Sequence, residues 1–207
     1  MIHLIRTTCC AALLGAALGC AAPIAVVGQD TKPAAALSVV ALSGQRVPVL
    51  PMTYLVADAV AGVPAGHADI VAWADSIIGE ALEARGPEVQ WVLAPALRST
   101  VRRAPTMLPP PDNLGQAVLR SSGIDRVPDP LRIHLRALAA LTNSRMIMVP
   151  AAARFSNVDG GVQAEVDFVL ADARNGSVVW RSRPTAVAAT AGDALRLATQ
   201  YLLPDVR

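Results

Sequence analysis

Apolar and polar positions follow two different periods along this chain. Between residues 68 and 85, apolar side chains recur every three or four positions, a spacing that lines one face of a helix. These are Ile70, Trp73, Ala74, Ile77, Ile78, Ala81 and Leu82. Arg85, Gly86 and Pro87 follow as a typical helix stop. The acidic residues of the segment, including Asp75, are expected off this face.

The last third of the sequence has the two-residue period of strands instead. Three runs, 145–155, 162–171 and 177–183, are joined by turn signals at residues 159–161 and 175–176, which predicts an antiparallel meander. In the middle run Glu165 and Asp167 fall on the expected wet face. We expect both carboxylates to be solvated and to have Arg181 or Arg183 of the next strand as cross-strand partner. The alternative is that the two carboxylates act as a general acid and a general base in catalysis.

The remaining runs place strands and helices on either side of the 68–85 helix. Residues 37–42, 47–57 and 89–94 are predicted strands, and a helix–strand alternation of this length favours parallel pairing. A helical turn follows through Arg103, and residues 104–112 form a stiff proline-rich connection. Three further helices are expected: one capped by Asp112, one starting at Asp129 and Pro130, and one capped by Asp193.

These elements predict an α/β to α+β domain. Its mixed sheet would have about five strands with a C-terminal antiparallel meander, and helices would pack against the sheet. Residues 37–207 would form this single domain, in which 104–112 is a loop and 113–142 an inserted helical pair.

The first 28 residues predict export. Arg6 is followed by an alanine- and leucine-rich stretch that ends among small residues, and the next charge is Asp30, as in a secretory signal peptide. The signal peptide would be cleaved either after Gly28 or before Cys20, and in the second case a lipid would be attached to Cys20. Residues 29–36 would form a flexible lead to the domain. The alternative is an uncleaved inner-membrane anchor, because the uncharged run between Arg6 and Asp30 is long enough to span a bilayer.

The amino-acid composition indicates the cellular compartment, the source and the charge of the protein. All three cysteines, Cys9, Cys10 and Cys20, lie in the leader, so a chain starting at Gln29 has none. Lys32 is the only lysine among 18 basic residues, an arginine bias that points to a GC-rich bacterium. Removing residues 1–28 leaves 17 basic and 16 acidic residues, a net charge of +1 that implies neither nucleic acid nor an anionic membrane.

Several chemistries are excluded by residue type. With Lys32 in the lead and no cysteine downstream of it, the domain offers no phosphate-loop lysine, Schiff-base lysine, thiol nucleophile or cysteine zinc site. We therefore expect no cofactor, no metal site and no catalytic residue. His134 lies on the apolar stripe of its helix and is interpreted as a buried, hydrogen-bonded histidine. A secreted hydrolase that uses His134 with a distant serine or carboxylate is the alternative.

One basic cluster is a candidate binding site. Arg98, Arg102 and Arg103 are spaced to share one side of a helix, where they could hold a phosphate or an acidic partner. No aromatic residues are interleaved with them, which argues against nucleic acid. The alternative is a solvated helix face.

Two motifs carry a resemblance to known proteins. They are Val47-Pro-Val-Leu-Pro51 and the hairpin Leu170-Ala-Asp-Ala-Arg-Asn-Gly-Ser-Val-Val-Trp180, with the 68–85 helix and the run from Val89 between them. In this order they resemble the small α/β domain of bacterial envelope proteins. That group includes the TolB amino-terminal domain, CsgG-type lipoproteins and lipoprotein activators of penicillin-binding proteins. The chain departs from them at residues 105–111 and in the two helices beyond.

The resemblance implies a function by binding and transfers no catalytic residue. We therefore expect a non-enzymatic accessory module in the periplasm or at the outer membrane. Its partner would be another envelope protein, and its contact with the membrane would be through the leader or a lipid at Cys20.

Overall fold

The computed structural model describes residues 37–57 and 59–203, all within one compact unit, Lys32–Arg207. The predicted signal peptide, the flexible lead and Cys20 lie outside the described residues. Among the residues that are described, no helix has the length and apolar character needed to cross a membrane.

The central element is an antiparallel pair of long strands, as the meander predicted. β4 (Met146–Val158) pairs with β5 (Gly161–Asp172), and β5 pairs with β6 (Ser177–Ser182) and, along its first half, with β7 (Thr185–Ala188). β2 (Leu55–Ala57) pairs with β4 in parallel and completes the mixed five-stranded sheet. The α+β class predicted from the sequence is confirmed, whereas β7 was not predicted.

A second, parallel pair lies along the same edge of β4 as β2, opposite β5. β1 (Arg46–Pro48) pairs with β3 (Gln90–Val92), and Val49 bridges to Met148 of β4. The predicted run 47–57 is therefore two short strands, separated where Pro51 and its neighbours leave the ladder. β4 itself has a bulge between Pro150 and Ala152, because a proline cannot donate to a ladder in the middle of a sheet.

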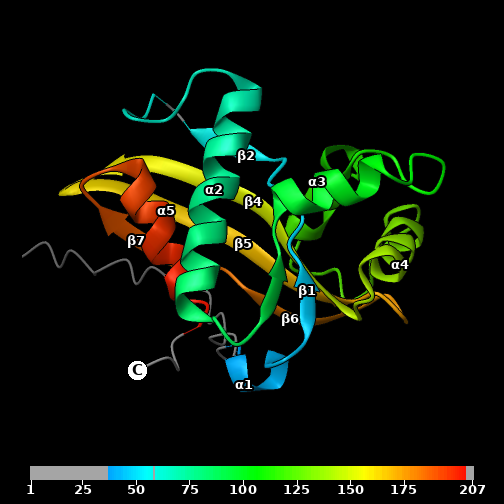
Figure 1. Ribbon diagram of the computed structural model, residues 1–207. Coiled ribbons are helices and arrows are strands. Elements are labelled where there is room, and N and C mark those ends of the chain that lie inside the picture. Colours follow the sequence, from blue (N-terminus) through cyan, green and yellow to red (C-terminus); the bar gives the residue numbers. More distant parts are fainter. Residues whose placement is uncertain (1–36, 58, 204–207) are drawn as a thin grey trace, which may run out of the picture. The chain divides into compact units, whose positions relative to one another are not determined.

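Two helical layers cover the two faces of the sheet. α2 (His67–Arg85) and α5 (Ala191–Gln200) lie side by side over β4 and β5 (Figure 1), and bury Phe155 and Phe168 beneath them. The opposite face carries a second core, with α3 (Ala94–Arg102), η2 (Gln116–Arg120) and α4 (Leu131–Thr142) packed on Ile147 and Val169. The predicted 68–85 helix is thus confirmed almost residue for residue.

The prediction was wrong in three details: the type of one element, the type of a second, and the residue that caps a third. Residues 37–42 are not a strand but contain the one-turn helix α1 (Val39–Leu42), because a short apolar run has no period that distinguishes the two. The segment that begins at Asp112 forms two 3₁₀ turns, η1 (Pro111–Asn113) and η2, rather than a capped α-helix. α5 is capped by the hydroxyl of Thr190, which accepts from the backbone N–H of Asp193.

Candidate functional site

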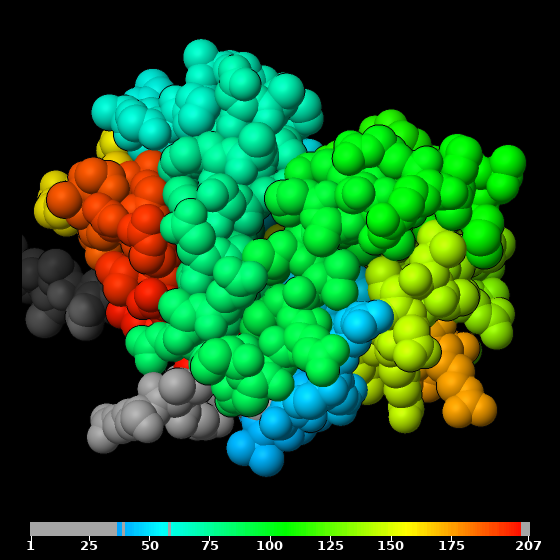
Figure 2. Space-filling model, viewed as in Figure 1, coloured from blue at the N-terminus to red at the C-terminus, as the bar shows by residue number. Residues whose placement is uncertain are grey.

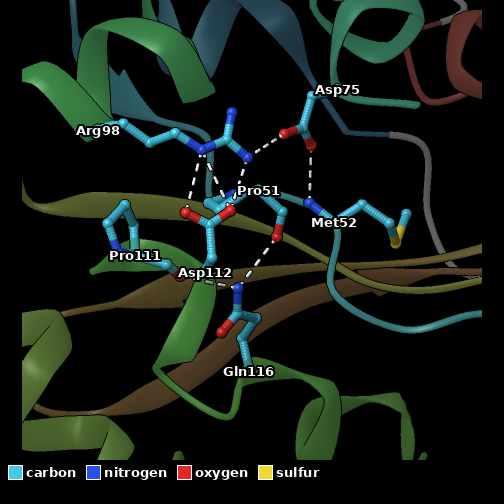
Figure 3. Close-up of polar contacts among 7 residues, drawn as sticks. All are labelled: Pro51, Met52, Asp75, Arg98, Pro111, Asp112 and Gln116. Carbon is cyan, nitrogen blue, oxygen red and sulfur yellow. Dashed lines mark hydrogen bonds and ion pairs between the residues drawn. The ribbon is translucent and has the colours of Figure 1, made fainter. Parts of the chain in front are cut away.

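Arg98 on α3 joins three parts of the fold through its guanidinium group. Its Nη2 lies 2.6 Å from Asp75 Oδ2 of α2 and 2.6 Å from Asp112 Oδ1 of η1 (Figure 3). Its Nε also donates to both carboxylate oxygens of Asp112, each at 3.1 Å. Asp75 Oδ1 accepts the backbone N–H of Met52 at 2.8 Å, which ties the β1–β2 connection to α2.

Burial and the ion pairs shift the pKa values of Asp75 and Arg98. Burial raises the pKa of Asp75, although the Met52 N–H and Arg98 oppose that rise. The hydrogen bonds from Arg98 to Asp112 raise the pKa of the guanidinium above its ordinary value. Arg98 therefore stays charged and compensates a carboxylate whose side chain is only 5% exposed.

The sequence prediction for Asp75 was wrong. It is buried, because it stands four residues after Val71 and three before Ile78 and so shares their side of α2. That spacing was the signal that could have placed it on the apolar stripe.

Gln116 fastens the proline-rich segment from the other side. Its side-chain Nε2 donates to the carbonyl oxygens of Pro51, at 3.0 Å, and Pro111, at 3.1 Å (Figure 3). Gln116 is completely buried, and its Oε1 has no hydrogen-bond partner among the described residues. Together with the Arg98–Asp112 pair, this amide holds the end of the segment against the β1–β2 connection. Nothing in the local sequence pattern pointed to Gln116.

A groove of about 370 Å³ runs between α3 and the proline-rich segment. Its floor is apolar, with Val101 and Leu108 each almost fully buried. The exposed side chains of Pro105 and Pro110 form its rim, and Arg98 and Asp112 close one end. We call this hollow the proline groove.

The predicted arginine cluster divides into two kinds of residue. Arg98 is half-buried and occupied by its two carboxylate partners. Arg102 is exposed, lines the proline groove and makes no ion pair or hydrogen bond through its side chain with any described residue. Arg103, also exposed, contacts only the Thr100 hydroxyl through its side chain within the described chain. Two cations are thus left uncompensated at the end of α3.

Glu165 and Asp167 line a separate polar pocket of about 180 Å³ beside η2. Arg183, in the β6–β7 connection, is the predicted partner of Asp167, with its Nε at 2.6 Å. It also lies 3.9 Å from Glu165, whose nearer partner is Arg154 of β4, at 3.5 Å. Arg181 is not a partner, since its guanidinium donates to the carbonyl oxygens of Leu119 and Ile124 under η2. Asp167 is buried rather than solvated, and Arg183, which also donates to the Arg120 carbonyl oxygen of η2, lies against its carboxylate.

His134 is only half-buried, and its ring Nδ1 is buried without a hydrogen-bond partner among the described residues. The predicted hydrogen bond to the ring is therefore not made at this nitrogen. A catalytic histidine is normally oriented by such a bond, usually from a carboxylate. His67 is exposed at the start of α2, far along the chain from His134. Within residues 37–57 and 59–203, neither histidine ring makes a hydrogen bond to a serine or a carboxylate.

Comparison with known proteins gives distant structural neighbours and no family. No family model matches the chain, and no curated protein matches it. The LpoB C-terminal domain from Escherichia coli is 14% identical, with 71% of this chain and 85% of that one aligned at a TM-score of 0.44. The PelC dodecamer from Paraburkholderia phytofirmans is 17% identical over 82% and 94%, with a TM-score of 0.38. Lipoprotein GNA1162 from Neisseria meningitidis is 13% identical over 70% and 81%, with a TM-score of 0.37.

All of these similarities are weak, with TM-scores below 0.5, and none of them assigns a family or a role to this chain. What those proteins bind or how they assemble is not transferred to this chain at such TM-scores.

Proposed function

We propose that this chain is an exported, non-enzymatic accessory module of a bacterial envelope that binds another envelope protein through the proline groove. The observation that carries the proposal is the pairing of an apolar floor with uncompensated cations. Val101 and Leu108 offer buried apolar contact, while Arg102 on the rim has no acidic partner in the described chain. Arg103 adds a second exposed cation beside it.

The groove suits an acidic segment that also carries an apolar side chain. The apolar part would fill the floor between Val101 and Leu108, and a carboxylate would pair with Arg102. Arg98 takes no direct part, because its guanidinium already holds Asp75 and Asp112. It acts as a positioning residue that keeps the proline-rich wall in place.

The proposal that the protein is exported depends on the sequence of residues 1–28. The apolar stretch before Asp30 supports secretion, and cleavage before Cys20 would leave a lipid-bearing cysteine that keeps the domain at a membrane. Mass determination of the mature amino terminus separates the three possibilities: a start at Gln29, a lipid on Cys20, or a retained leader.

Site-specific cross-linking tests the groove. A photo-reactive residue at Pro105, on the exposed rim, is expected to trap a protein in intact envelopes that mass analysis then identifies. Arg102→Glu, alone or with Arg103→Glu, should reduce the trapped product at least tenfold, and high salt should weaken it in the unaltered chain. Arg126→Glu is the matched control, because Arg126 is also exposed and lies outside the groove. Equal loss, or no loss, in the Arg102 and Arg126 variants would contradict the proposal.

A further inference from the structure

Four arginines surround two adjoining hollows at the carboxyl end of α4. One hollow, of about 430 Å³, is lined by Arg136, Arg145 and Arg174. The other, of about 320 Å³, is lined by Arg46 and Arg145. Both hollows share Asn143 and Ser144 as well as Arg145, so they form one continuous surface without an aspartate or glutamate among its lining residues. We call it the four-arginine surface.

Most of the positive charge on this surface is uncompensated. The side chains of Arg136 and Arg174 make no ion pair or hydrogen bond with the part of the chain that the structure describes. Among the described residues, the guanidinium of Arg46 donates only to the backbone oxygen of Thr142, at 3.3 Å. Arg145 is bound through Nε and Nη2 to Asp172, whose side chain is 2% exposed, so its charge is compensated and the uncompensated cations are Arg46, Arg136 and Arg174. The outward-facing groups are therefore cations.

Tertiary structure assembles this surface from four separate segments. Arg46 begins β1, Arg136 belongs to α4, Arg145 precedes β4 and Arg174 lies in the β5–β6 turn. The carbonyl end of α4, where Asn143 takes a left-handed conformation, offsets part of their mutual repulsion through the helix dipole. A net charge of +1 for the mature chain conceals this local concentration, because most of the acids lie elsewhere.

The amino-terminal chain enters the fold beside this surface. Only Ser43, Gly44 and Gln45 separate α1 from Arg46, and in Figure 2 the blue surface of α1 and β1 adjoins the yellow-green surface of α4. The apolar leader precedes this entry point in the sequence. A lipid at Cys20 would leave residues 21–36 as the connection to the described fold.

We infer that the four-arginine surface docks onto the phosphate headgroups of an anionic phospholipid bilayer. Guanidinium groups pair with phosphate oxygens through forked hydrogen bonds, and a bilayer presents many phosphates in one plane. The inference rests on the proposed envelope location, but it does not involve the proline groove.

Vesicle binding of the full chain tests this inference. The chain carrying Cys20→Ala is mixed with vesicles of phosphatidylcholine alone or with about one third phosphatidylglycerol, at low and high salt. A retained leader would bind both kinds of vesicle alike, so the readout is the difference between them. We expect binding that requires the anionic lipid and falls with salt.

Paired variants assign the binding to the surface. Arg136→Gln with Arg174→Gln should weaken binding to anionic vesicles about 25-fold, since each arginine near such a surface contributes about fivefold. Arg126→Gln with Arg196→Gln removes the same charge from residues that line neither hollow, and should change it by less than about threefold.

Three results would overturn the inference: equal losses in the two double variants, no preference for anionic vesicles, or displacement by millimolar glycerol 3-phosphate. The last would assign the hollows to a soluble phosphate compound. Cross-linking at the proline groove is independent of all three results, so either proposal can fail alone.

Discussion

Replacing Arg98 by methionine is expected to destabilise the fold and to loosen the proline-rich segment. Methionine keeps most of the length of the arginine stem but removes every hydrogen bond to Asp75 and Asp112. Arg102→Met is the matched control, because Arg102 lies on the same helix, is exposed and makes no ion pair with any described residue.

The expected magnitude follows from the exposure of each carboxylate. The side chain of Asp112 is 37% exposed and can regain water, so its loss of Arg98 costs at most about 1 kcal/mol. The side chain of Asp75 is 5% exposed and would keep only the Met52 N–H, which costs about 1.5–3 kcal/mol. We expect the free energy of unfolding to fall by about 1.5–4 kcal/mol in Arg98→Met. The change in Arg102→Met should be within about 0.5 kcal/mol.

The destabilisation should depend on pH in a defined direction. Burial already raises the pKa of Asp75, and without Arg98 less opposes that rise. A carboxyl whose pKa is higher in the folded than in the unfolded protein loses stability as pH rises through the folded value. The deficit of Arg98→Met is therefore largest at neutral pH and narrows as the pH falls toward about 4.

Chemical denaturation of the variants at several pH values measures these effects. Adding Asp75→Asn to Arg98→Met should recover part of the loss, because the neutral amide can still accept the Met52 N–H without burying a charge. Equal stability of Arg98→Met and Arg102→Met, or a deficit that widens at low pH, would refute the account of Asp75 as a buried, compensated carboxylate.

Three further predictions concern the sheet. Phe155→Ala should cost about 3–5 kcal/mol in denaturant unfolding, since Phe155 is 1% exposed under α2; a loss below about 1 kcal/mol would contradict that packing. Asp167→Asn should lower the free energy of unfolding by about 1–3 kcal/mol, because Asp167 is buried and its carboxylate lies 2.6 Å from Arg183. Glu165→Gln should change it by less than about 0.5 kcal/mol, because the ion pairs of Glu165 are longer, at 3.5 and 3.9 Å. A larger loss in Glu165→Gln than in Asp167→Asn would contradict the assignment of Asp167 as the buried, ion-paired carboxylate. Burial favours a higher pKa for Asp172, but its hydrogen bonds from Arg145 and the backbone outweigh that effect and lower the pKa. The stability advantage over Asp172→Asn should therefore be present above about pH 4 and disappear as pH falls through the lowered pKa, a trend that a pH series of thermal unfolding checks.

The regular elements were predictable because their signal is local. The three-four spacing of Ile70 to Leu82 sets a helix wherever a sheet is present to cover it, and the alternation of Val162 to Leu170 sets a strand with one buried face. Turn residues such as Asn175 and Gly176 then fix the meander. Short runs without a period, at residues 37–42 and 185–188, were assigned wrongly or missed.

The candidate sites could be predicted only in part. The sequence indicated Arg102 and Arg103 as cations in one cluster, but it grouped Arg98 with them. Arg98 meets its acidic partners 23 and 14 residues away, a distance over which no periodicity operates. Gln116 reaches across 65 residues to the carbonyl of Pro51. Whether a charged side chain is free or compensated depends on such partners.

By itself, the sequence determined which of the longer periodic segments are helices and strands, which of their faces are largely apolar, and that no lysine or cysteine follows Lys32. These properties depend on residue type and on spacing within a few positions. Tertiary structure alone decided that Arg98 is neutralised while Arg102 is not, and that four arginines from distant segments share one surface. The physical reason is that electrostatic compensation acts between groups a few ångströms apart in space, however far apart they are along the chain.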